Sequence, residues 1–88
     1  MHESRLVADL VKRIDEEAVR SGARRVQEVR IEIGALSHVT PESLRSHMEL
    51  AAHGTTAETA TFVITKMTDH TEVNALDVRL VSITVEDG

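Results

Sequence analysis

The chain has 88 residues, a formal net charge of −5 and a single aromatic residue, so it has room for one domain with an aliphatic core. The acidic balance argues against binding to nucleic acid or to an anionic membrane, because both need clustered Lys and Arg. The chain has no cysteine, which excludes disulfides, iron–sulfur clusters, cysteine zinc sites and thiol catalysis. Without a membrane-length apolar run or a signal-peptide pattern, a cytoplasmic location is expected.

The first predicted element is an amphipathic helix from Glu3 to Ser21. Apolar side chains recur along it at helical spacing with charged residues between them, so one face is expected to be buried. Gly22 follows, and glycine is favoured there because it adopts a left-handed backbone conformation without a steric penalty. The apolar stripe comprises Leu6, Val7, Leu10, Val11, Ile14 and Ala18.

A strand and a second helix are predicted next. Apolar and charged residues alternate over residues 28–33, which indicates a strand with one buried face that ends at Gly34. The helix begins at Pro41 and continues as far as Gly54. Thr40 is placed to cap it, and proline is favoured at the first helical position because its missing N–H is not needed there.

Two further strands are predicted at Thr59–Met67 and Leu76–Glu86, and a hairpin is the simplest way to pair them. Val78 and Leu80 have the opposite parity to the later apolar residues of their strand, which indicates a β-bulge or burial on both faces. The order α-β-α-β-β predicts the α/β (α+β) class: a two-layer sandwich with two helices on one face of a three-stranded sheet. An edge strand in such a sheet leaves a homo-oligomer open as an interpretation.

Arg20, Arg24 and Arg25 form the one dense basic spot of the sequence, at the end of the first predicted helix. Because cations stabilise the negative end of a helix dipole, a structural role is the favoured interpretation. A docking patch for an acidic partner is the alternative.

The sequence offers no catalytic residue set, so the chain is not expected to be an enzyme. No Ser-His-Asp or Cys-His arrangement and no glycine-rich phosphate loop can be assembled. The histidines form no HExxH motif and no close pair, and His47 and His53 are expected on different faces of their helix. Four of them are interpreted as surface or packing residues: His38, His47, His53 and His70.

His2 differs from the other histidines because it follows the first residue. A free α-amine titrates near about pH 8, so a metal ion can displace its proton close to neutrality. The amine, the intervening backbone nitrogen and the imidazole can close small fused rings around one ion. Planar nitrogen donors suit Ni(II) and Cu(II), whereas Zn(II) prefers a tetrahedron. An ordinary N-terminal tail is the alternative interpretation.

An ordered set of short segments resembles the HypA/HybF family of nickel-insertion proteins. The opening tripeptide before an amphipathic helix resembles the start of that family, and the sequence VRIEIGALS resembles its first strand and Gly-x-Leu-Ser turn. Other segments resemble the two ends of its second helix and its last strand. The segments are Met1-His2-Glu3, residues 29–37, Val39 with Pro41-Glu42 and Leu44, Gly54-Thr55 and residues 78–86.

The resemblance implies a nickel site and a function. Nickel would be bound by the amine of Met1, the backbone nitrogens of His2 and Glu3, and the imidazole of His2. The implied function is that of a metallochaperone, which hands Ni(II) to the large subunit of [NiFe]-hydrogenase together with a partner GTPase. In some members urease is also a recipient.

The chain departs from the family at its zinc domain, which carries two CxxC motifs between the second and third strands. That position holds only the short loop at residues 68–75, so no zinc is expected. Residues 1–88 are therefore predicted to form a single HypA-like nickel-binding domain. Because the zinc domain is missing, a metal-free docking or adaptor module of the hydrogenase maturation machinery is the alternative.

Overall fold

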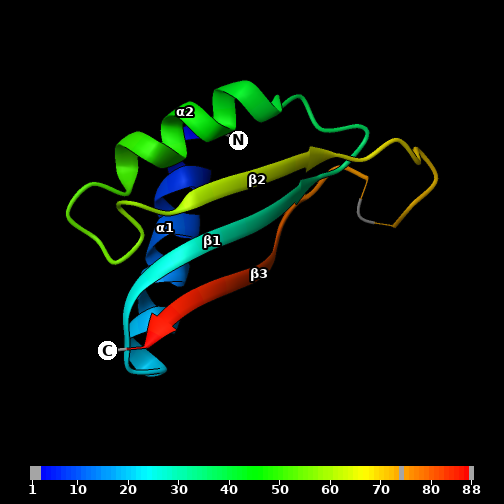
Figure 1. Cartoon of the computed structure of the whole chain (residues 1–88). Coiled ribbons are helices and arrows are strands. Elements are labelled where there is room, and N and C mark those ends of the chain that lie inside the picture. Colours follow the sequence, from blue (N-terminus) through cyan, green and yellow to red (C-terminus); the bar gives the residue numbers. More distant parts are fainter. Residues whose placement is uncertain (1–2, 74, 88) are drawn as a thin grey trace.

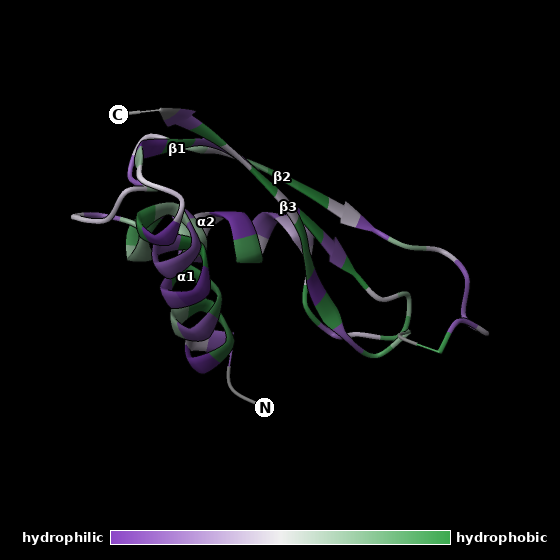
Figure 2. Cartoon of the chain, turned by 90° about the horizontal axis from the view of Figure 1, so that it is seen from below, coloured by the Kyte–Doolittle hydropathy of each residue, from purple (hydrophilic) through white to green (hydrophobic). Residues whose placement is uncertain are grey.

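The computed structural model describes residues 3–73 and 75–87, which form two helices and three strands. Both helices lie on the same side of the sheet, as Figures 1 and 2 show, so the predicted α+β sandwich and element order are confirmed. Within the described residues, neither helix has the length and hydropathy of a bilayer-spanning segment. The elements are α1 (Glu3–Arg20), β1 (Ala23–Ile33), α2 (Pro41–Ala51), β2 (Thr61–Lys66) and β3 (Val78–Asp87).

The ends of the helices follow the local sequence signals. Gly22 has φ +75°, so the residue after α1 adopts the left-handed conformation that favours glycine. At the start of α2, the hydroxyl of Thr40 accepts a hydrogen bond from the backbone N–H of Ser43 at 3.2 Å. This contact satisfies one of the N–H groups that the first turn of a helix leaves without a partner.

The order of the strands corrects one sequence prediction. The sheet runs β2-β1-β3, with β2 parallel and β3 antiparallel to β1, so the predicted hairpin between β2 and β3 is wrong. The chain returns across the sheet through α2, and such a crossover makes β2 parallel to β1. Both strands then end at the same end of the sheet, from which β3 runs back along the free edge of β1 and pairs its backbone groups (Figure 1).

The apolar residues of β3 change from even-numbered to odd-numbered positions along the strand because the strand contains a β-bulge. Leu80 pairs with Ile31 and Ser82 with Arg30, so Val81 is an extra residue opposite the β1 strand. The shift places Leu80 before the bulge opposite buried Ile31 and Ile83 after it opposite buried Val29, while Val81 itself is 50% exposed. The predicted bulge is confirmed.

The core lies between the inner face of the sheet and the two helices. Four residues of β1 are at most 1% exposed, and the predicted apolar stripe of α1 packs on them, with Leu6 partly buried at its edge. Burial of each such aliphatic side chain contributes about 1.5–3 kcal/mol relative to its exposed state. The buried residues of β1 are Val26, Val29, Ile31 and Ile33.

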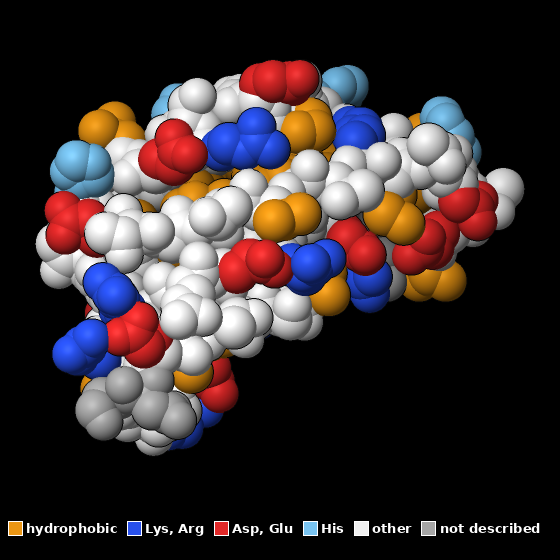
Figure 3. Space-filling view, in the orientation of Figure 1, with side chains coloured by type: hydrophobic (Ala, Val, Ile, Leu, Met, Phe, Trp, Pro, Cys, Tyr) orange, Lys and Arg blue, Asp and Glu red, His pale blue; other side chains and the backbone are white. Residues whose placement is uncertain are grey.

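The outer face of the sheet carries acidic and basic side chains interspersed with one another (Figure 3). Arg79 and Glu32 form a cross-strand pair at 2.7 Å, and Arg25 pairs with Glu86 at 2.9 Å. The same Glu86 also binds Arg24, and Arg20 binds Glu17 on α1. Arg20 lies in the last turn of α1, as the helix-dipole interpretation requires, whereas Arg24 and Arg25 lie in β1 and pair with Glu86 instead.

Candidate metal centre

The predicted nickel ligands fall at the start of α1. Met1 and His2 lie outside the described residues, and Glu3 is the first residue of the helix. The backbone N–H groups in the first turn of an α-helix have no carbonyl partner within the helix. The helix dipole also favours negative charge at this end. The backbone nitrogen of Glu3 is thus placed where the loss of its proton costs no helical hydrogen bond.

The carboxylate of Glu3 is held by two side chains of α2. The hydroxyl of Ser43 donates a hydrogen bond to Oε2 of Glu3 at 2.8 Å, and Nδ1 of His47 contacts the same oxygen. The side chain of Glu3 is 24% exposed and that of His47 is 53% exposed, so the contact lies at the surface with the carboxylate on its inner side. We call these two contacts the Glu3 tether.

The tether favours the ionised form of the Glu3 carboxyl group. Burial raises its pKa, but the hydrogen bonds from His47 and Ser43 and the attraction to the His47 ring outweigh burial and lower the pKa below its ordinary value. A carboxylate can only accept hydrogen bonds, so Nδ1 of His47 is the donor.

Local structure explains why these two residues of α2 share a direction. Ser43 and His47 are four residues apart, so they lie one above the other on the same face of the helix. The neighbouring pair Leu44 and Met48 is fully buried, at 0% exposure, and fixes the rotation of α2 on the core. The face that carries Ser43 and His47 is consequently turned toward the first turn of α1.

A groove of about 510 Å³ opens beside Glu3. It lies between the first turn of α1, the turn after β1 and the start of β3, with His38 among its lining residues. Leu36 and Leu76 in its walls are 43% and 71% exposed, so the groove is apolar and open to solvent. Its other aliphatic lining residues are Leu6, Val39 and Val78.

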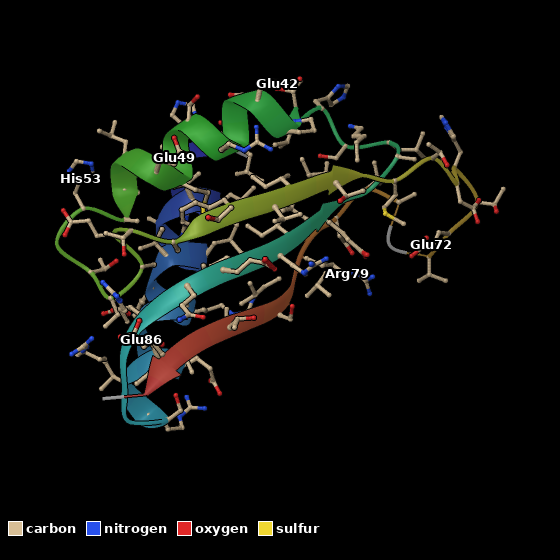
Figure 4. All side chains as sticks on the ribbon, viewed as in Figure 1. Glu42, Glu49, His53, Glu72, Arg79 and Glu86 are labelled. Carbon is tan, nitrogen blue, oxygen red and sulfur yellow. The ribbon has the colours of Figure 1, made fainter. Side chains whose placement is uncertain are left out.

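The other described histidines do not join Glu3 in a side-chain metal site. Figure 4 shows His53 at the opposite end of α2 from Glu42. Among the residues that the structure describes, no three His, Asp or Glu side chains are grouped closely enough to hold a metal ion. A metal site at the start of α1 therefore needs main-chain donors or donors from residues 1 and 2.

Sequence reasoning did not identify Ser43 and His47, and it interpreted His47 as a surface or packing residue. Their spacing of four residues was the available signal, because it places both on one helix face. No sequence pattern brings residue 3 to residues 43 and 47, however. That contact depends on how α1 packs against α2.

Comparisons with known proteins identify relatives of the chain. Residues 1–76 match a family model described as hydrogenase/urease nickel incorporation, metallochaperone, hypA. The hydrogenase maturation factor HypA of Rhizobium leguminosarum bv. viciae is 40% identical over 67 residues, which are 76% of this chain and 59% of that protein. The protein of the same name from Rhodopseudomonas palustris (strain BisB5) is 44% identical over 64 residues, 73% of this chain and 57% of the relative. The chain spans little more than half the length of these curated relatives.

A solved structure supports the fold. The solution structure of the Ni metallochaperone HypA from Helicobacter pylori aligns with a TM-score of 0.84 at 17% identity and covers 100% of both chains. The alignment includes β3, which lies beyond the residues that match the family model.

Proposed function

The chain belongs to the HypA family of hydrogenase/urease nickel incorporation metallochaperones, and on that premise we propose that it binds Ni(II) at its N-terminus and helps to deliver it to a [NiFe]-hydrogenase during maturation. The observation that carries the proposal is the position of Glu3. It is the first residue of α1, and its carboxylate is held by α2. The chain segment that carries the proposed ligands thus continues directly into an element that is packed on the core.

The proposed donor set is the amine of Met1, the backbone nitrogens of His2 and Glu3, and the imidazole of His2. Four nitrogens in fused chelate rings favour a planar arrangement, which suits Ni(II) better than Zn(II). Binding through backbone nitrogens requires that they lose their protons. The start of α1 supports this loss, because its N–H groups have no helical partner and the dipole stabilises the negative charge that develops.

The proposal also covers partners and location. We place the chain in the cytoplasm, where it would contact the maturation GTPase and the large subunit of the hydrogenase and perform no catalysis itself. No zinc is proposed, because the chain has no cysteine to supply CxxC ligands.

Residues 1–88 are proposed to act as one domain, with a short loop at 68–75 in place of the zinc domain. The end of this loop is fastened to the turn after β1. Leu36 donates its backbone N–H to the carbonyl of Ala75 at 2.8 Å, and Gly34 donates to that of Asp77 at 2.7 Å. These bonds support a short closed connection at this end of the sheet.

A nickel titration of the chain with its native, unblocked N-terminus tests the proposal. We expect one Ni(II) per chain with the absorption of a low-spin planar complex, and loss of that absorption in His2→Ala and in a variant with residues added before Met1. His53→Ala is the matched control, because it removes an exposed imidazole far from Glu3 and should bind nickel like the wild type. Unaltered binding by His2→Ala would refute the proposed site.

A metal-free adaptor is the second candidate function, and two observations favour it. The chain lacks the cysteines of a zinc domain, and an open apolar groove lies beside Glu3. Co-purification with the maturation GTPase separates the candidates. An adaptor keeps its partner in the presence of a chelator and in His2→Ala, whereas loss of the partner under either condition contradicts this alternative.

A further inference from the structure

The Glu3 tether joins the start of α1 to a well-anchored part of α2. Both donors, the Ser43 hydroxyl and Nδ1 of His47, meet at the single oxygen Oε2 of Glu3. Hydrogen bonds to an ionised acceptor are about twice as strong as those between neutral groups. Two such bonds from one helix face restrict both the position and the rotation of residue 3.

The donors are themselves fixed. The backbone N–H of Ser43 donates to the hydroxyl of Thr40, which caps α2, and the adjacent Leu44 and Met48 are fully buried. The buried residues thus fix α2 on the core, and the hydrogen bonds from α2 to the carboxylate in turn fix Glu3. Without this contact, Glu3 itself would be held only by the hydrogen bonds of the first helical turn, since the nearest core contact is that of Leu6, and helix ends fray readily.

We propose that Ser43 and His47 are positioning residues of the nickel site. By holding the carboxylate of Glu3, they fix the backbone at the first helical residue. The backbone nitrogen of Glu3, which is one of the proposed donors, is then held in place before the metal arrives. This inference rests on the proposed function, because it assigns the tether to the same N-terminal site.

The physical basis is preorganisation. A chelate that must be closed by a frayed segment loses conformational freedom when the metal binds, and that loss weakens the affinity. Groups that orient metal ligands without touching the metal typically change its affinity by about 10–100-fold when they are removed. The Glu3 tether is partly exposed, so we expect an effect at the lower end, about tenfold for removal of both side chains.

α1 provides a matched control. Further along this helix, Oδ1 of Asp15 accepts hydrogen bonds from the backbone N–H of Thr56 at 2.9 Å and from its hydroxyl at 2.6 Å. This second contact, the Asp15 tether, also fastens α1 to the segment after α2. It lies three helical turns from Glu3, so its removal should weaken packing without changing the geometry of residue 3.

The experiment measures nickel affinity, the planar absorption band and the thermal midpoint for five chains with native N-termini. These are the wild type, the double variant Ser43→Ala/His47→Ala, His47→Ala, His47→Asn and the control Asp15→Ala. We expect about tenfold weaker nickel binding and faster nickel loss in the double variant, with a smaller effect in His47→Ala. Asp15→Ala should lower the thermal midpoint and leave the nickel affinity unchanged.

His47→Asn separates positioning from ligation. The amide of Asn can donate to Glu3 from a position close to that of Nδ1, but it cannot replace an imidazole as a metal ligand. We expect His47→Asn to recover most of the affinity lost in His47→Ala, with the wild-type spectrum. Equal loss in both variants would overturn the proposal and would assign His47 to the metal itself.

Failure of the inference and failure of the proposed function give different results. If the wild type forms the planar complex and the double variant binds nickel with the same affinity, the positioning role is refuted while the proposed site stands. Equal losses of affinity in the double variant and in Asp15→Ala would also refute the positioning role, because general destabilisation would then explain both. If the wild type forms no planar complex, the proposed function fails first.

Discussion

Two carboxylates fasten α1 to the rest of the domain, and they differ in what surrounds them. Asp15 is bound by the backbone and the hydroxyl of a single residue, Thr56, whose carbonyl in turn accepts the N–H of Val26 at 2.8 Å. Glu3 is bound only by side chains, Ser43 and His47. The Asp15 tether therefore belongs to a main-chain junction between α1, the α2–β2 segment and β1. The Glu3 tether can change with two substitutions that leave the backbone bonds intact.

This difference shows that hydrogen bonds to an ionised carboxylate can have two roles in one helix. An ionised carboxylate near a helix terminus or at a helix flank gains strength from hydrogen bonds that favour its charged form. At Asp15 the gain stabilises the fold. At Glu3 the same gain orders the residue that adjoins the proposed metal site.

The largest expected effect comes from the part of α1 between the tethers. Ile14 is 0% exposed, and Ile14→Ala should destabilise the protein by about 2–5 kcal/mol because it removes buried methylene groups and leaves a cavity. Urea denaturation measures this change. Val19→Ala is the control on the same helix, since Val19 is 63% exposed and its truncation should have little effect. A similar loss in both variants would contradict the assignment of Ile14 to the core of the protein.

An intermediate effect is expected when the carboxylates are protonated. The hydroxyl of Thr56, and next its backbone N–H, lower the pKa of Asp15 below its ordinary value of 3.8. The folded-state pKa is therefore below the unfolded-state pKa. The stabilisation is fully present above the unfolded-state pKa and is lost as the pH falls through the folded-state pKa. The lowered pKa of Glu3 contributes with the same sign, starting from an ordinary value of 4.5.

Thermal unfolding from about pH 6 to about pH 2 measures this dependence. Asp15→Asn, which cannot titrate, should lose less stability in acid than the wild type. An unchanged acid slope in this variant would contradict the hydrogen-bond assignment at Thr56.

The smallest effect is expected on the outer face of the sheet. Glu86 binds Arg25 and Arg24, and these contacts lower its pKa, but both arginine side chains are more than half exposed to solvent. Water and salt screen such pairs, so Glu86→Gln should change the thermal midpoint less than Asp15→Ala does. The difference from wild type should shrink further in high salt. A change as large as that of Asp15→Ala would show that this ion pair is part of the structural framework.

Most of the secondary structure could be predicted from local patterns. The α1 helix ends within one residue of its predicted end, and α2 begins at Pro41 as its cap signals indicate. β1 starts at Ala23, earlier than the predicted residues 28–33. The prediction missed its first part because the pairing with β3 is irregular there and the residues do not alternate between apolar and charged. There Arg24 and Gln27 have no direct partner on β3, so charged and apolar residues do not alternate with a strict period of two.

The candidate site was predicted only in part. The identity of Met1, His2 and Glu3 as proposed ligands could be drawn from adjacency along the chain, because chelate rings involve neighbouring residues. Ser43 and His47 could not, since the contact with Glu3 spans some forty residues of sequence. Nor could the strand order, because a hairpin and a crossover satisfy the same local pattern.

The sequence by itself determined where the helices begin with their cap signals and the absence of cysteine ligands, because each depends on residue type and short-range spacing. Only the tertiary structure decided that β1 is the central strand and that α2 meets the first turn of α1. These arrangements depend on which apolar faces bury one another and on which backbone groups remain to be paired, and both are properties of the whole chain.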